Sequence, residues 1–135
     1  MQTFLPSPSM GESVRFLDNK RLGKQRVEAF QILKALRGEY EKTGAWVNHP
    51  ATKMWRGYED ALTFYKDLCI EEWIRRGFKN TMEYKKEHAV KMPPWIGRND
   101  IHASHRSNLL RKDPEYYSKF NWKEPDDMPY VWPVQ

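Results

Sequence analysis

Helical periodicity is the feature of this 135-residue chain that most constrains its fold. Apolar residues recur three and four positions apart in three segments, near residues 18–37, 50–76 and 99–111. No stretch alternates apolar and polar residues as a half-buried strand does. The length is also usual for one domain. We therefore predict an all-α fold, a compact single domain over residues 1–135 with three main helices.

The segments between and beyond these helices are predicted to be short or irregular. Two prolines interrupt the N-terminal arm, residues 1–8. A capping-box spacing that begins at Ser9 predicts a short helix over residues 10–17. Charged residues favour a surface helix over residues 81–89. The C-terminal tail, residues 121–135, combines three prolines with aromatic side chains, and we expect its rings to wrap around the core.

Charge and cysteine content limit the class of protein. A net charge of +5, from 23 Lys and Arg against 18 Asp and Glu, favours a polyanionic partner such as nucleic acid. Charge alone does not decide this, because many basic proteins bind nothing charged. The single cysteine, Cys69, excludes an internal disulfide. No stretch approaches the ~20 apolar residues of a membrane span, so we expect a cytoplasmic protein without a membrane partner.

Cations and one carboxylate share a face of the first predicted helix. The residues on this face are spaced three or four apart, so they lie above one another on a helix. They are Arg21, Lys24, Glu28 and Gln31. DNA phosphates could approach the cations, and the lone glutamate could do acid–base or electrostatic work. The residues alone leave a second interpretation open, a solvated face with ion pairs of about 0.3–0.5 kcal/mol each.

Three segments, in this order along the chain, resemble a known family. They are residues 18–28 (DNKRLGKQRVE), residues 72–78 (EWIRRGF) and residues 101–109 (IHASHRSNL). With the chain length and the aromatic tail, they make the chain similar to the pyrimidine-dimer DNA glycosylases of the endonuclease V type. The resemblance covers nearly the whole chain. It implies a three-helix DNA-repair enzyme that removes a dimerised or modified pyrimidine from double-stranded DNA and then cleaves the abasic strand as a lyase.

The resemblance also assigns catalytic roles. Glu28 matches the catalytic glutamate of the family, which stabilises a cationic transition state and moves protons. The nucleophile of the family is an N-terminal α-amine, which forms an imine with the damaged nucleotide. Because Gln2 is too large for efficient removal of the initiator methionine, we expect the Met1 amine to act here, within several ångströms of Glu28. The chain has Val27 and Gln31 where the family has arginines.

Further side chains are expected to contact DNA beside Glu28, from the first and third helices. They are Lys20, Arg21, Lys24, Gln25, Gln31, His105, Arg106 and Asn108. His102 and His105 are three residues apart and could form a metal trio with His49. No cysteine cluster or pair of carboxylates accompanies them, so we predict no metal ion and no cofactor.

The expected function is that of a monomeric DNA glycosylase and abasic-site lyase, associated with the nucleoid when it acts on DNA. Two alternatives remain open. The chain could be a catalytically silent module that binds DNA or RNA, which salt-dependent binding without strand cleavage would indicate. It could also be an enzyme that cleaves the N-glycosidic bond of free nucleosides or nucleotides, which a pocket too closed for duplex DNA would indicate.

Overall fold

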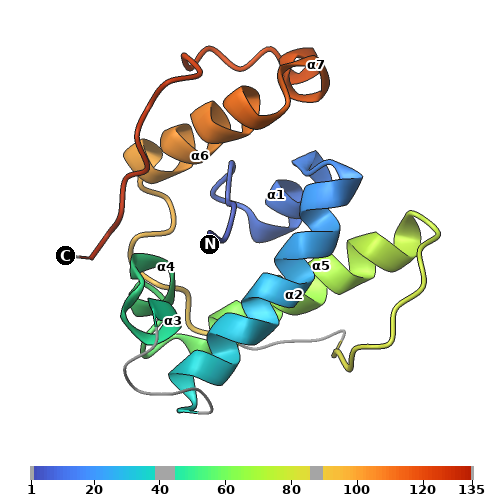
Figure 1. Ribbon diagram of the computed structural model, residues 1–135, viewed down its shortest axis with the longest axis vertical. Coiled ribbons are helices and arrows are strands. Elements are labelled where there is room, and N and C mark those ends of the chain that lie inside the picture. The colour runs from blue at the N-terminus through green and yellow to red at the C-terminus, as the bar shows by residue number, and fades with distance from the viewer. Residues whose placement is uncertain (1, 39–44, 86–89, 135) are drawn as a thin grey trace.

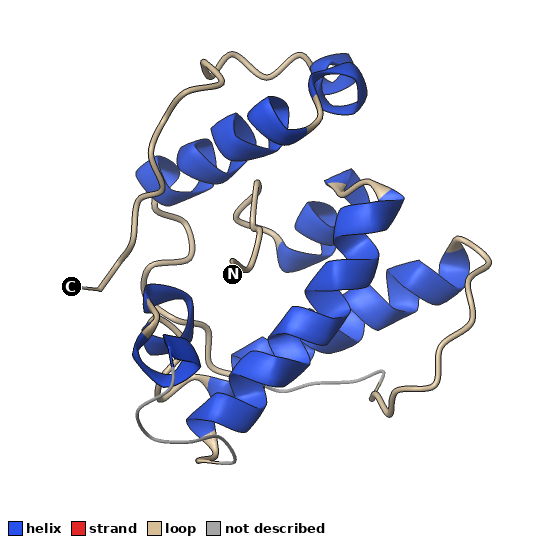
Figure 2. Ribbon diagram, in the orientation of Figure 1, coloured by secondary structure: helices blue, strands red, loops and turns tan. Residues whose placement is uncertain are grey.

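The structure, a computed structural model, describes residues 2–38, 45–85 and 90–134, and these are helical with no strand (Figure 2). In chain order the helices are α1 (Met10–Phe16), α2 (Asn19–Leu36), α3 (Ala45–Asn48), α4 (Pro50–Lys53), α5 (Glu59–Arg75), α6 (Asn99–Lys112), α7 (Pro114–Tyr117) and the 3-10 helix η1 (Ser118–Phe120). The predicted all-α fold is therefore confirmed. None of the helices in these ranges is long and apolar enough to cross a membrane.

Two of the three predicted main helices are correct, and the third is interrupted. Helices α2 and α6 match the predicted segments to within one residue at each end. The helix predicted over residues 50–76 is instead divided into α4 and α5. Gly57 lies between them with a φ of 85°, a left-handed conformation that a helix cannot continue. The turn brings Trp55 into the core, where its side chain is fully buried.

The predictions for the shorter segments have mixed outcomes. Helix α1 forms where it was expected, and the Ser9 hydroxyl accepts a hydrogen bond from the Glu12 N–H at 3.1 Å. The helix predicted over residues 81–89 is wrong for residues 81–85, and residues 86–89 lie outside the described ranges. The Asn80 side chain bonds both the N–H and the carbonyl oxygen of Met82, which competes with helical hydrogen bonding there.

Helix α2 packs along α5, and α1 also lies against α5 (Figure 1). Helix α6 lies on the other side of the molecule, and the N-terminal arm runs between α6 and α2 (Figure 1). Large side chains from the arm, from α2 and α5 and from α6 are fully buried and form one core. Among these are Leu5, Leu22, Trp55, Tyr65, Ile101 and Tyr117.

The N-terminal arm is an internal element, because every residue from 2 to 7 is buried. An irregular segment in the interior needs hydrogen-bond partners for its backbone. Helix α6 supplies two of them at Leu5, whose N–H donates to Nδ1 of His105 at 2.9 Å. The Gly97 N–H donates to Nε2 of His102, so Nδ1 of His102 carries the proton and donates to the Leu5 oxygen at 2.7 Å. Helix α6 thus bonds both the N–H and the carbonyl oxygen of Leu5 and fixes the arm there.

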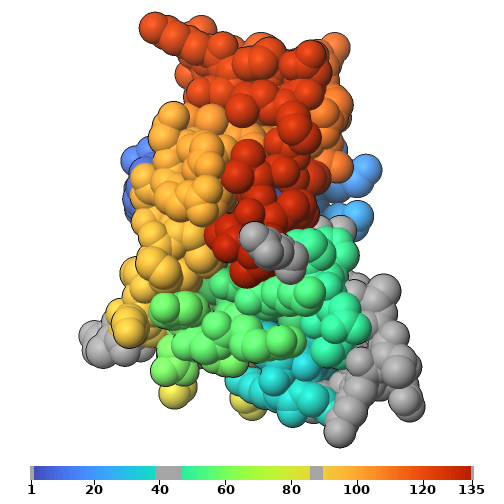
Figure 3. Space-filling view, turned by 90° about the vertical axis from the view of Figure 1, so that its left-hand side faces the viewer, coloured from blue at the N-terminus to red at the C-terminus, as the bar shows by residue number. Residues whose placement is uncertain are grey.

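The C-terminal tail lies on the surface beside the orange segment that leads into α6 and reaches the green segment around α4 (Figure 3). Its aromatic rings make the contacts. Trp122 stacks on Tyr117 with ring centroids 5.7 Å apart, and Trp132 meets the edge of His49 at 5.7 Å. The expectation that the tail wraps around the core through its rings agrees with these contacts.

Candidate active site

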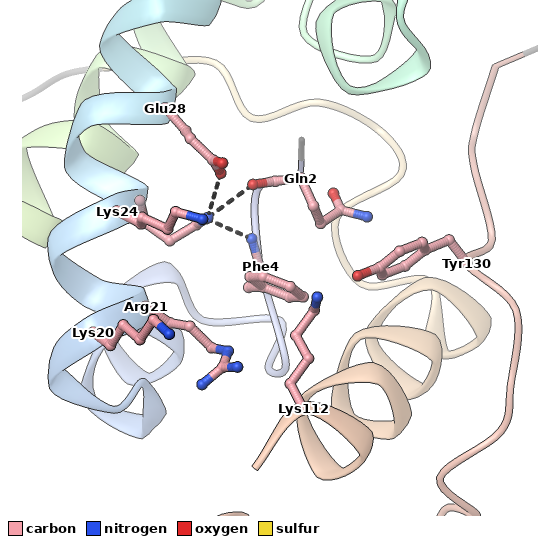
Figure 4. A pocket seen from close by; sticks show the side chains of 9 residues that line it. Gln2, Phe4, Lys20, Arg21, Lys24, Glu28, Lys112 and Tyr130 are labelled. Atoms are coloured by element: carbon pink, nitrogen blue, oxygen red, sulfur yellow. Dashed lines mark hydrogen bonds between the residues drawn. The ribbon is translucent and has the colours of Figure 1, made fainter.

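An open pocket of about 300 Å³ lies where the N-terminal arm passes between α2 and α6 (Figure 4). Its walls come from four parts of the chain: the arm, α2, the last turn of α6 and the tail. The lining residues are Gln2, Phe4, Lys20, Arg21, Lys24, Gln25, Glu28, Lys112 and Tyr130. The pocket therefore brings together segments that are more than 100 residues apart in the sequence.

The pocket is cationic. Lys20, Arg21 and Lys24 project from successive turns of α2, and Lys112 faces them from α6 (Figure 4). Arg21 is paired with Asp18 at 3.2 Å. Within the described part of the chain, the three lysines have no carboxylate partner. They are exposed, so their charges are available to an anionic ligand such as a phosphodiester.

Glu28 is the one acidic side chain among the lining residues, all of which are described. Its Oε2 accepts a hydrogen bond of 2.9 Å from Nε2 of Gln25. The same nitrogen donates to the backbone oxygen of Gln2 at 2.8 Å, so the carboxylate is tied to the start of the arm. Met1 lies outside the described residues, and its position relative to Glu28 stays a prediction. The residue that follows it, Gln2, shares the pocket with Glu28.

The comparisons with known proteins identify the family of the chain. The model of the family described as pyrimidine dimer DNA glycosylase matches residues 1–86, which include the arm, α2 and Glu28. The chain belongs to the pyrimidine dimer DNA glycosylase family. No curated protein and no solved structure matches it. The resemblance inferred from the sequence is therefore confirmed, and DNA is the substrate that the family acts on.

For a glycosylase of this family, the α2 residues divide into two groups. Arg21, Lys24 and Glu28 line the pocket together, as their helical spacing predicted, and Lys20 lines it beside them. Gln25 also lines it, but it is only 2% exposed and its amide is bonded within the protein, and a DNA contact by Gln25 stays a prediction. Gln31 is half-buried and lies outside the pocket lining.

The α6 residues expected to contact DNA have other roles in this structure. His105 and Asn108 are fully buried, and their contact with DNA stays a prediction. Burial lowers the pKa of His105 to about 3, so the ring is neutral and accepts from Leu5. Asn108 donates to backbone oxygens in α6 and in the tail, at 2.8 and 3.1 Å. Arg106 pairs with Glu124 at 2.8 Å and also donates to the Pro6 oxygen, so it ties the tail to the arm.

Four pocket residues are not predicted from the sequence, namely Gln2, Phe4, Lys112 and Tyr130. The arm and the tail have no periodicity from which a facing direction could be inferred. Tyr130 is half-buried, and its ring lies 6.4 Å from the Phe4 ring. Burial raises the pKa of its hydroxyl, so this group is a neutral donor in the pocket. The aromatic content of the tail was the only available signal for it.

The histidines considered for a metal site bond the backbone of the arm and of α4. His102 and His105 bond the two sides of Leu5, and His49 caps α4 by accepting from the Ala51 N–H at 3.0 Å. The residues that the structure describes contain no group of three or more His, Cys, Asp or Glu that could hold a metal ion.

Proposed function

We propose that the chain is a monomeric DNA glycosylase and abasic-site lyase that removes a dimerised or modified pyrimidine from double-stranded DNA in the pocket between α2 and α6. The observation that carries the proposal is the placement of one carboxylate, Glu28, among four cations and beside the start of the N-terminal arm. The family supplies the glycosylase activity. The lyase step and the roles of individual residues belong to the proposal.

The cations account for DNA binding. Lys20 and Lys24 lie on one side of the pocket and Lys112 on the other, so a DNA strand that enters it would meet positive charge on both sides (Figure 4). Each phosphate that a lysine neutralises releases a counterion, which provides affinity without base specificity. The base would then be selected inside the pocket, where Phe4 and Tyr130 offer ring surface.

Glu28 and the N-terminal amine would share the chemistry. The neutral amine attacks C1′ of the damaged nucleotide, and the base departs with the electron pair of the glycosidic bond. The Glu28 carboxylate stabilises the positive charge that develops on the sugar as this bond breaks. The adduct loses a proton and opens to an imine between the amine and C1′. Removal of a proton from C2′ then expels the 3′ phosphate, and water releases the enzyme from C1′.

The volume of the pocket also fits an alternative function, the cleavage of free nucleotides. About 300 Å³ is at the lower end of the range for small-molecule sites, which run from about 300 to 1,000 Å³. An enzyme that hydrolyses free nucleotides could use the same carboxylate and the same cations. Activity on UV-irradiated duplex DNA without activity on mononucleotides separates the two functions.

The test is the nicking of supercoiled, UV-irradiated plasmid by the wild type and by Glu28→Gln. This substitution keeps the side-chain shape and removes the charge, so we expect nicking to slow by roughly 10²-fold or more. Glu12→Gln is the matched control, because Glu12 is exposed on α1 outside the pocket. Nicking by Glu28→Gln at the wild-type rate would contradict the assignment. Plasmid binding without nicking by the wild type would indicate the silent binding module.

A further inference from the structure

Gln25 is the point at which Glu28, the N-terminal arm and α5 are joined. Its Nε2 donates to the Glu28 carboxylate at 2.9 Å and to the Gln2 oxygen at 2.8 Å. Its Oε1 accepts from the Phe4 N–H at 2.8 Å. The Tyr65 hydroxyl lies 2.8 Å from the same Oε1, and its one hydrogen is shared between this oxygen and the Phe4 oxygen. Both ends of one buried amide are therefore occupied by groups from three different segments.

These partners fix the orientation of the amide. A flipped amide would place its NH₂ group against the N–H of Phe4, a donor that needs an acceptor. The Tyr65 side chain that meets the oxygen is fully buried in α5 and also contacts the Phe4 oxygen at 2.7 Å. Nε2 of Gln25 must consequently face the pocket, where its two hydrogens match the Glu28 carboxylate and the Gln2 oxygen.

We propose that Gln25 is a positioning residue, which holds the Glu28 carboxylate at a fixed separation from the start of the N-terminal arm. The proposal rests on the proposed function, in which Glu28 and the N-terminal amine act on the same sugar. Since a single nitrogen atom bonds both the carboxylate and the arm, neither can move independently of the other. A misplacement of about 1 Å can cost about 10²-fold in rate, so this tether contributes to catalysis without touching DNA.

The decisive variant is Gln25→Glu. The new side chain keeps the shape and an acceptor for the Phe4 N–H, but it loses both donations and repels Glu28. We expect kcat for UV-irradiated duplex to fall by roughly 10- to 100-fold. Lys34→Gln is the charge control, because it lowers the net charge by the same one unit on the same helix outside the pocket lining. Both variants should raise KM to a similar extent, and Gln25→Glu alone should lower kcat.

The pH profile distinguishes positioning from general loosening of the fold. A protonated carboxyl group regains one O–H donor, so the kcat of Gln25→Glu relative to the wild type should rise as the pH is lowered. Gln25→Met cannot regain a donor, and its relative kcat should stay low at every pH. Gln25→Met also tests the proposal if Gln25→Glu fails to fold, because a wild-type kcat for folded Gln25→Met would overturn it.

The outcomes separate this proposal from the proposed function. If Glu28→Gln is slow and Gln25→Glu retains the wild-type kcat, the positioning role is refuted and the function stands. If Glu28→Gln itself retains full activity, the proposed function fails and Gln25 has no carboxylate to position. A reduced kcat for Gln25→Glu that does not change with pH would show a structural effect and overturn the proposal.

Discussion

The Tyr65 hydroxyl joins α5 to the arm, and its removal by Tyr65→Phe has a calculable cost. The side chain is fully buried, and its oxygen lies 2.7 Å from the Phe4 oxygen and 2.8 Å from Oε1 of Gln25. Phenylalanine fills almost the same volume, so the main effect is that the two buried oxygens sharing the single hydroxyl hydrogen, those of Phe4 and Gln25, lose this donor. Leaving a buried acceptor unsatisfied costs about 1–3 kcal/mol.

This cost predicts a shift in thermal stability. The entropy of unfolding is about 2.1 cal/mol/K per residue, which for 135 residues is roughly 0.28 kcal/mol/K. A loss of about 2 kcal/mol therefore lowers the Tm by about 7 °C. Circular dichroism measures the Tm, and urea unfolding gives the free energy independently. The variant should also lower kcat modestly, because Gln25 loses one of the groups that orient it.

Tyr58→Phe is the matched control for this prediction. Tyr58 is half-buried at the start of α5, and its hydroxyl has no hydrogen bond to any residue that the structure describes. Its removal should change the free energy of unfolding by no more than about 0.5 kcal/mol. Equal stabilities of Tyr65→Phe and Tyr58→Phe would refute the reasoning, because the arm would then not depend on the buried hydroxyl.

Two further predictions concern DNA binding and acid stability. Replacing Lys24 and Lys112 together with alanine should lower the salt slope of DNA binding by about two units, one per phosphate contact. Lys123→Ala in the exposed tail is the control and should leave the slope unchanged. An unchanged slope in the double variant would show that the pocket cations are only solvated. Burial lowers the pKa of His105 from 6.5 to about 3, so between these values the unfolded chain binds a proton that the folded chain does not. The stability that the neutral ring allows is full above pH 6.5 and is lost as the pH falls toward 3. The free energy of unfolding falls by at most about 1.4 kcal/mol per pH unit in this range. Urea unfolding between about pH 7 and pH 5 checks this, and His105→Gln, whose amide oxygen can still accept from Leu5, should flatten the slope; an equal slope would contradict it.

The sequence predicts those parts of the fold that depend on local periodicity. Helices α2 and α6 have apolar residues at helical spacing, and both form where expected. The pocket face of α2 follows from the same geometry, because Arg21, Lys24 and Glu28 are one turn apart. The break before α5 was missed because apolar residues continue through it, and the burial of Trp55 depends on tertiary contacts.

The burial of polar side chains on α6 has one physical cause. This helix is covered by two irregular segments, the arm and the tail, whose backbones lack partners of their own. Polar side chains of α6 are buried to bond them: His105 bonds Leu5, Ser107 accepts from the Met128 N–H at 3.0 Å, and Asn108 donates to the Met128 oxygen. In sequence such residues resemble a polar surface that could contact DNA. Only the path of the arm and tail distinguishes these alternatives.

The central claim is that the N-terminal amine and Glu28 act on the same nucleotide. Borohydride reduction during the reaction with UV-irradiated duplex DNA tests it most directly, because reduction converts an imine into a permanent bond between protein and DNA. We predict a covalent adduct that peptide mapping locates at the N-terminal peptide, and no adduct after acetylation of the α-amine. An adduct at a lysine such as Lys24 or Lys112, or strand cleavage by the acetylated protein at the full rate, would contradict the account.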